Sequence, residues 1–267
     1  MDGSPPVERA FSRDELLRHA ESPPFPAFQI EGRLTREAVD FLAQLFEDAH
    51  AEELSGLSVQ DFLAGAHAIW LESAVRSAES QKVQLRALMR ADGGDLARLS
   101  LEIAGPDMPF LVDSVMGEIS AQGLNALALF HPIVSCRRDA DGRRAATGAE
   151  ARESYIWVHL DPLDSKRRAD LLKGIEATLA DVRAAVADFP AMQARLRDAT
   201  RELQAAASPA SAAEHAESVE FLTWLTDRFT FLGVREQSYP RGADGKILEG
   251  DPVVAPHSGL GVLRDLS

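Results

Sequence analysis

Residues 103–115 constrain the fold of this chain more than any other stretch. An alternating apolar pattern up to Ile103 is typical of a strand, Gly105-Pro106 ends that strand, and Pro109 opens a segment whose apolar residues follow helical spacing. We therefore expect a strand, a tight turn and a helix in direct succession. The turn would expose peptide N–H groups at the helix N-terminus, whose partial positive charge favours a carboxylate or a phosphate.

A β-hairpin is predicted just before this junction. Apolar and polar residues alternate over 83–90 and again over 97–103, and Asp92-Gly93-Gly94 supplies a turn between them. Such a hairpin has one apolar and one polar face. The helix that begins at Pro109 is expected to end at Gly123, a residue suited to a left-handed cap.

The segments after Gly123 continue the alternation of strand and helix. Strands are predicted over 125–137 and 154–161, followed by a helix from about Leu171 that Pro190 interrupts. Apart from its last strand, this order is the βαββαβ plan of ferredoxin-like domains. The missing strand could be the leading one over 82–90 or a later one over 230–237.

The first 80 residues are predicted to be helical. Ser12 with Glu15 has the spacing of a capping box, Thr35 marks a second helix start, and a third helix begins near Ser58. The proline-rich stretch 22–26 cannot continue a helix and is expected to be an extended connector.

The C-terminal part has a different character. Small residues and proline over 206–216 indicate a linker, followed by a short amphipathic helix over 219–225. Strands are expected over 229–239 and 246–254. A new apolar run begins at Leu263, which suggests that a second module starts here.

One motif resembles a known family. The run Asp107-Met108-Pro109-Phe110-Leu111-Val112-Asp113-Ser114-Val115 is similar to a signature near the N-terminus of the large bacterial NAD-specific glutamate dehydrogenases. The resemblance spans roughly residues 80–267 and, more weakly, the N-terminal helices. It extends to these further segments: 131–134, 153–160, 181–186, 221–225 and 229–233.

This resemblance implies a fold. In that family the leading segments are ACT-like regulatory domains, and the dehydrogenase and NAD-binding domains lie far downstream. We therefore expect an α+β fold: a helical segment over 1–80, a ferredoxin-like or ACT-type βαββαβ domain over 81–206, and over 207–267 a linker with the beginning of a second α+β module.

The resemblance also implies a function. The full-length enzyme would deaminate L-glutamate oxidatively to 2-oxoglutarate and ammonia with NAD, whereas this region would hold no cofactor and would regulate or assemble the enzyme. Its expected partners are downstream domains of the same polypeptide, further copies in a homo-oligomer, and an amino-acid effector. The alternatives are a purely structural oligomerisation module without a ligand, or a small free-standing enzyme, which the lack of a recognisable nucleophile or acid/base pair disfavours.

Charge and cysteine content narrow the choice of partners. The formal net charge of -14 argues against nucleic acid and against an anionic membrane surface. The basic pair Arg137-Arg138 is interpreted as a solvated face. Cys136 is the only cysteine, which fits the reducing cytoplasm, and neither an N-terminal signal sequence nor a membrane-spanning apolar run is expected.

The turn at Asp107 is the candidate ligand site. The resemblance implies that an acidic residue followed closely by proline lies at this connection in ACT domains, where backbone groups hold an amino acid. Asp107 and Pro109 match, but glycine usually follows that proline and this chain has Phe110. In the alternative interpretation Asp107 caps the helix and Phe110 belongs to the core.

Asp113 is expected to be partly buried, because apolar residues surround it in the sequence. It could receive the ammonium group of an amino acid, or it could pair with an arginine. The expected ligand-binding set is therefore Asp107, Met108, Pro109, Asp113 and Asn125.

Tyr155, Trp157 and His159 alternate with aliphatic residues, so they should share one face of a strand. If the aliphatic face packs on the helices, the aromatic face needs another cover. We expect a sheet from a neighbouring domain or subunit to provide it, which makes these three residues interface candidates. Single-stranded RNA could also stack on such a face, but the acidic charge disfavours it.

No metal site is expected. His131 and His159 lie on strands that should pair, but two ligands are too few for zinc. If Arg138 lies opposite Glu153, His131 falls opposite Leu160, and the two imidazoles point to different faces.

Overall fold

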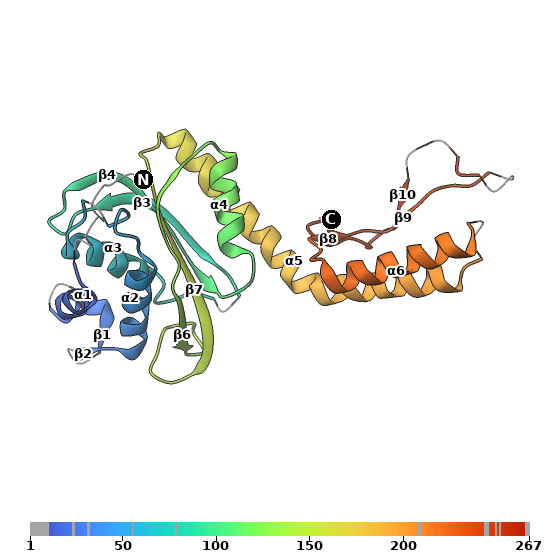
Figure 1. Cartoon of the computed structure of the whole chain (residues 1–267). Coiled ribbons are helices and arrows are strands. Elements are labelled where there is room, and N and C mark those ends of the chain that lie inside the picture. The colour runs from blue at the N-terminus through green and yellow to red at the C-terminus, as the bar shows by residue number, and fades with distance from the viewer. Residues whose placement is uncertain are drawn as a thin grey trace, which may run out of the picture. The chain divides into compact units, whose positions relative to one another are not determined.

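The computed structural model describes residues 11–22, 25–30, 33–54, 56–77, 79–207, 210–242, 246–248, 250 and 252–264. The chain forms two compact units, Met1–Glu176 and Ala177–Ser267. Figure 1 labels their helices and strands.

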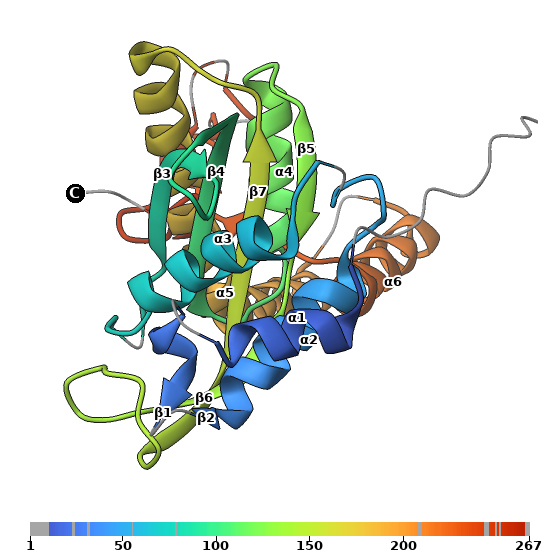
Figure 2. The ribbon, with the colours of Figure 1, turned by 90° about the vertical axis from the view of Figure 1, so that its left-hand side faces the viewer.

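A five-stranded antiparallel sheet is the centre of the first unit (Figures 1 and 2). The strand order is β3-β4-β7-β5. Strand β6 also pairs with β7, on the same side as β5 and further along its length. The strands are β3 (Lys82–Met89), β4 (Asp95–Pro106), β5 (Ala126–Phe130), β6 (Ile133–Arg138) and β7 (Ala149–Leu160).

The register of β4 and β7 gives the sheet two different faces. Leu101 pairs with Val158 and Ile103 with Ile156, which places an aliphatic layer on one face. Ser100, Glu102 and Ala104 lie on the other face, together with their partners on β7, and all three are buried. The polar face of the expected hairpin is therefore covered rather than solvated.

Two groups of helices cover the two faces (Figures 1 and 2). Helix α4 (Leu111–Ala121) and the first turns of α5 (Ser165–Ala205) lie on one side, and α1 (Arg13–Ala20), α2 (Arg36–Asp48) and α3 (Val59–Glu72) lie on the other. The aliphatic face is buried under α4 and α5.

The predicted helix starts in the N-terminal layer are confirmed. The hydroxyl of Ser12 accepts from the N–H of Glu15, that of Thr35 accepts from Ala38, and Ser58 forms a reciprocal capping box with Asp61. Each cap satisfies peptide N–H groups that a helix start leaves without an intrahelical partner.

The expected extended connector over 22–26 is only partly described, because residues 23 and 24 lie outside the described residues. Pro26–Phe28 forms a 3₁₀ helix, η1, instead of an extended segment. A short ladder of β1 (Gln29–Ile30) and β2 (Arg33–Leu34) follows. The prolines correctly indicated that no α-helix continues here, but they did not indicate the short 3₁₀ helix.

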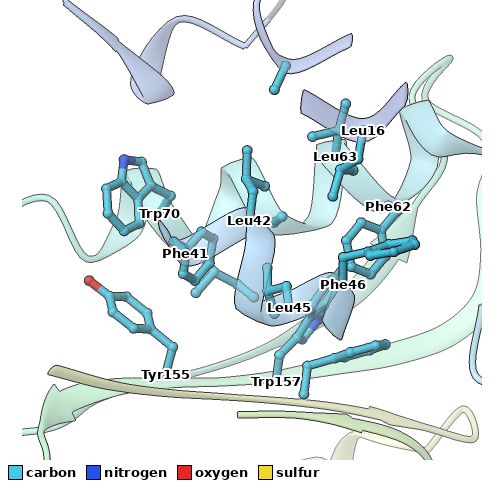
Figure 3. Close-up of a cluster of buried hydrophobic side chains, with 14 of the residues drawn as sticks. Leu16, Phe41, Leu42, Leu45, Phe46, Phe62, Leu63, Trp70, Tyr155 and Trp157 are labelled. Carbon is cyan, nitrogen blue, oxygen red and sulfur yellow. The ribbon is translucent and has the colours of Figure 1, made fainter. Parts of the chain in front are cut away.

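The N-terminal helices and the sheet share one hydrophobic core (Figure 3). The ring of Phe41 lies 5.0 Å from Tyr155, and that of Phe62 lies 5.4 Å from Trp157, measured between ring centroids. Trp70 stacks on Tyr155 at 5.9 Å. Helices α2 and α3 therefore belong to the layer that buries the aromatic face of the sheet.

The expected α+β class is confirmed as a mixed fold with an antiparallel sheet, and so is the hairpin of β3 and β4. The strand beside β4 is the leading strand β3, whereas 230–237 takes no part in this sheet. The first of the two candidates for the missing strand is therefore the one found in the sheet, and because it precedes the other strands the chain order differs from βαββαβ. The single strand expected over 125–137 is divided at His131-Pro132 into β5 and β6.

The β5 and β6 edge of the sheet is protected by side chains. The Glu53 carboxylate accepts from the N–H of Leu129 at 2.9 Å, and the Gln44 side-chain oxygen accepts from the N–H of Ile133 at 2.9 Å. Both peptide donors point away from β7, and exposed donors of this kind would otherwise invite another strand.

The second unit contains most of α5 and the whole of α6 (Ala212–Arg228). Pro190 lies inside α5, so the prediction that it interrupts the helix is wrong. Proline removes one intrahelical hydrogen-bond donor and commonly kinks a helix. In a helix of 41 residues, the hydrogen bonds of the turns on either side maintain the helix. Since α6 begins at Ala212, it occupies part of the expected linker, of which residues 208 and 209 lie outside the described residues.

The strands of the second unit are much shorter than predicted. Each has two residues: β8 (Gly233–Val234) pairs with β11 (Leu260–Gly261), and β9 (Gln237–Ser238) pairs with β10 (Val253–Val254). The run after Leu263 and the N-terminus lie largely outside the described residues. Within the described ranges, no helix has the length and apolar character needed to cross a membrane.

Candidate functional site

The strand-to-helix junction lies where the sequence places it, but the helix begins two residues after Pro109. Phe110 is the N-cap of α4 and has a φ of 71°, in the left-handed region that glycine adopts freely. Its side chain is 42% exposed, so the interpretation of Phe110 as a core residue is wrong. A bulky residue here costs roughly 1–2 kcal/mol of backbone strain.

Asp107 is held by Arg152 rather than acting as a helix cap. Its N–H donates to the carbonyl of Arg152 at 3.1 Å, and its carboxylate lies 3.3 Å from the Arg152 guanidinium. Next to it, the sulfur of Met108 accepts from the side-chain amide of Gln81 at 3.8 Å. These contacts fix the turn against β7.

The remaining members of the expected ligand-binding set are exposed. Pro109, Asp113 and Asn125 face solvent, so the expectation that Asp113 is partly buried is wrong. Its position in the first turn of α4 leaves it on the outer side of the helix. The cavities between α2 and β6, beside Trp70, and between α5 and α6 are lined by other residues. The ligand-binding role of the set stays a prediction.

The interface expected at Tyr155, Trp157 and His159 needs correction. Their exposed fractions are 1%, 1% and 0%, because α2 and α3 of the same chain cover this face (Figure 3). A neighbouring sheet is therefore not what buries them. Both helices were predicted, but nothing in the sequence indicated which surface they would cover.

A buried ionic network lies beside Tyr155 and was missed in the sequence. The Glu153 carboxylate, 0% exposed, accepts from Arg138 Nε at 2.6 Å and from a second Arg138 nitrogen at 2.9 Å. Arg76 lies 2.8 Å away, and the Tyr155 hydroxyl donates at 2.9 Å. Burial raises the pKa of Glu153, but the hydrogen bonds and charges of Arg138 and Arg76 outweigh it and leave the pKa lowered.

Arg138 and a further arginine, Arg144, bind the C-terminal end of α3. Arg138 donates to the carbonyls of Ser73 at 2.9 Å and Ala74 at 3.2 Å. Arg144 donates to the carbonyl of Trp70 at 3.1 Å, and its guanidinium lies 3.5 Å from the centroid of the Trp70 ring. Cations at a helix C-terminus are favourable, so the network fastens the helical layer to the sheet.

Arg138 is thus buried rather than solvated, and its position in the ladder differs from the expectation. It pairs with Ala149 in the register, while Val134 lies opposite Glu153. The two charged side chains meet across the strands all the same. Arg138 lies two residues from Cys136, and Glu153 lies two residues from Tyr155, so each shares a strand face with a buried neighbour. This spacing was the sequence signal that could have placed both charged residues inside the protein.

The two histidines do not meet. His131 follows β5 and lies 2.8 Å from the hydroxyl of Ser154, while Leu160 pairs with Ala126. His159 is enclosed by Trp157 and Phe130, and neither ring nitrogen has a hydrogen-bond partner in the described structure. Burial lowers its pKa to about 3. Within the described ranges, no three His, Cys, Asp or Glu side chains are placed to hold a metal ion.

One cavity of the first unit lies between α2 and β6. It has a volume of about 260 Å³ and is lined by charged side chains of both elements and of Glu150 on β7. A more apolar cavity of about 480 Å³ lies beside Trp70 and Arg144. In the second unit, a cavity of about 530 Å³ lies between α5 and α6, where Thr200 and Thr226 face it.

The comparison with known proteins agrees with the arrangement of the first unit. The family model described as glutamate dehydrogenase, ACT1 domain, matches residues 41–175, which include part of α2, the whole of α3 and the complete sheet.

Three relatives are NAD-specific glutamate dehydrogenases. That of Halomonas elongata is 34% identical over 78% of this chain, that of Pseudomonas aeruginosa 31% over 84%, and that of Mycobacterium tuberculosis 29% over 67%. The matched segments are 14%, 14% and 11% of these relatives' own lengths, so the chain spans about a seventh of the first two. The chain belongs to the glutamate dehydrogenase ACT1 domain family and corresponds to the N-terminal region of the large NAD-specific enzymes.

Proposed function

We propose that this chain is a non-catalytic regulatory and assembly region of a cytoplasmic, NAD-dependent glutamate dehydrogenase. The whole enzyme would convert L-glutamate to 2-oxoglutarate and ammonia, and NAD would bind to domains beyond this region. The family match over 41–175 carries the proposal. In the same unit, the buried polar groups around Glu153 are engaged in holding α3 on the sheet, which suits a scaffold better than a site of chemistry.

The assembly part of the proposal is supported by the second unit. Phe221, Trp224 and Phe229 are 54%, 49% and 48% exposed, and their rings contact one another in series. Adjacent exposed aromatic residues commonly mark a protein contact. The proposed partners are downstream domains of the same polypeptide and further copies of the enzyme.

The regulatory part of the proposal depends on a difference in the affinity of an effector for two arrangements of the domains. An amino-acid effector that binds one arrangement of the domains more tightly shifts the population toward it, and thereby changes the distant active site. If the module is purely structural, amino acids leave the kinetics unchanged and only assembly depends on this region.

The test compares the full-length enzyme with a form that lacks this region. We expect the shortened enzyme to keep glutamate oxidation but to lose its response to amino acids, its assembly state, or both, as measured by kinetics and by sedimentation. Glutamate oxidation by the 267-residue chain alone, or unchanged regulation and assembly after its removal, would refute the proposal.

A further inference from the structure

We infer that the cavity between α2 and β6 binds a free α-amino acid through both of its charged groups. The inference rests on the proposed regulatory function and names a place for its effector. The cavity is separate from the junction at Asp107, whose residues do not line it.

The cavity has fixed walls. Arg36, Asp40 and Gln44 follow one another at intervals of four residues, so they share one face of α2. Gln44 accepts the hydrogen bond from the N–H of Ile133 at 2.9 Å, which holds this face against β6. Val134, at the wall of the cavity, is 1% exposed and belongs to the core.

The lining contains charges of both signs. Arg137 lies 2.9 Å from Glu150, and Arg36 lies 3.9 Å from Asp40. Glu37 adds a third carboxylate, for which the described residues show no ion pair. Two guanidinium groups and three carboxylates give the lining a formal charge of about -1 at neutral pH, which disfavours a dianion such as a phosphate ester.

The edge of β6 adds peptide groups to the lining. The N–H of Ile133 points away from β7 to Gln44, and the carbonyl of Arg137 accepts from Ala145 at 2.9 Å on the same side. Because strand peptides alternate with a period of two, the N–H and carbonyl of Ser135 also point away from β7. Ser135 lines the cavity, so these groups offer one donor and one acceptor to a ligand.

A zwitterion matches this arrangement better than a simple ion. Its carboxylate can bind the guanidinium of Arg137 and the N–H of Ser135, while its ammonium group can bind Glu37 and the carbonyl of Ser135. The volume of about 260 Å³ is below that of most sites for drug-sized molecules and suits a small metabolite. Since the charged side chains are largely exposed, we expect a dissociation constant of roughly 0.1–1 mM.

The first experiment titrates the 267-residue chain with each L-amino acid and follows backbone amide signals by NMR. The expected result is saturable shifts at Glu37, Ser135 and Arg137. The best ligand is then compared with its 2-oxo acid, which lacks the ammonium group, and with its decarboxylated amine. Each analogue should bind at least about tenfold more weakly, because each loses one of the two charged contacts.

Variants test the assignment. Arg137→Gln and Glu37→Gln should each weaken binding by about tenfold, whereas Arg167→Gln, an exposed arginine at the start of α5, should leave binding unchanged. Thermal melting shows whether each variant is folded. The two substitutions lie on different elements, so a folding defect in one still leaves the other informative.

Three outcomes would overturn the inference: no saturable shift up to about 10 mM of any amino acid, equal affinity for the 2-oxo acid, or shifts confined to Asp107–Asp113. The proposed function fails separately. Binding in the cavity without any effect on the kinetics or assembly of the full-length enzyme would refute regulation and leave the site standing, and regulation without shifts at the cavity would refute only the site.

Discussion

Gly65 of α3 lies directly against the indole ring of Trp157 on β7. A Cβ atom at position 65 would lie 2.7 Å from Trp157 Cη2 and closer still to Cζ2. The ring itself is 1% exposed and packs between Phe62 and Phe130. The absence of a side chain at Gly65 therefore sets how closely the helical layer approaches the sheet.

Gly65→Ala should destabilise the protein by roughly 1–3 kcal/mol, because α3 or Trp157 must move to admit the methyl group. The intrinsic helix preference of alanine, about 1 kcal/mol over glycine, acts in the opposite direction and is outweighed. Urea unfolding measures the difference. Gly117→Ala in α4 is the matched control: its Cβ would meet no atom within 4 Å, so this variant should be slightly more stable than the parent.

The backbone at Phe110 gives a second prediction. Phe110→Gly should be more stable than Phe110→Ala by about 1 kcal/mol, because both variants lose the ring but only glycine relieves the left-handed conformation at φ 71°. Comparing the two variants removes the contribution of the lost side chain. Equal unfolding free energies would show that the turn relaxes to a negative φ.

Glu153→Gln should destabilise the protein by roughly 3–5 kcal/mol. The substitution leaves Arg138 buried without its carboxylate, and removing one partner of a buried ion pair is costly. Denaturant unfolding at neutral pH checks the loss. Asp170→Asn removes the exposed partner of Lys166 and should change stability very little, so a comparable loss there would contradict the argument from burial.

His159 should make the protein sensitive to acid. Its imidazole stays neutral in the folded state down to a pKa of about 3, whereas the ordinary value is 6.5. As the pH falls below 6.5, the unfolded chain binds a proton that the folded chain excludes, so stability decreases by about 1.4 kcal/mol per pH unit through this group. Above pH 6.5 the contribution is fully present.

His159→Phe should keep the packing against Trp157 and Phe130 but remove this proton. The loss of unfolding free energy between about pH 7.5 and about pH 5 should be smaller in the variant by about 2 kcal/mol. If parent and variant lose the same amount, the acid sensitivity of the protein lies in other groups. Arg98→Gln removes a nearby positive charge and should raise the pKa of His159, so the stability loss of this variant should level off at a higher pH than that of the parent.

Local features of the fold could be predicted from the sequence. The caps at Ser12, Thr35 and Ser58 depend on a side chain and a peptide group three residues away, so they need no tertiary information. Gly123 adopts the expected left-handed conformation, with a φ of 67°. The hairpin turn at Gly93 was evident for the same reason, because its φ of 88° favours glycine.

Features that depend on distant segments could not be predicted. Alternation indicated a polar face for the hairpin and an aromatic face at Trp157, but it could not show that these form one surface or that α2 and α3 cover it. The register shifts between Ala87 and Met89 on β3 and between Ala126 and Ala128 on β5 were not evident from the alternation either. The sequence did not show which residue would pair with Asp107. Its partner, Arg152, lies on the neighbouring strand β7, 45 residues further along the chain.

The side chains of Gln44 and Glu53 limit where a further strand can join the sheet, because their oxygens lie at the β5 and β6 edge. They occupy outward peptide donors of Ile133 and Leu129, and α2 stands beside the same margin. In the described part of the chain, β3 at the opposite margin pairs with β4 alone. Extension of the sheet by any added strand is therefore directional: it proceeds outward from β3, because a strand approaching from the other margin meets α2 and the side chains of Gln44 and Glu53.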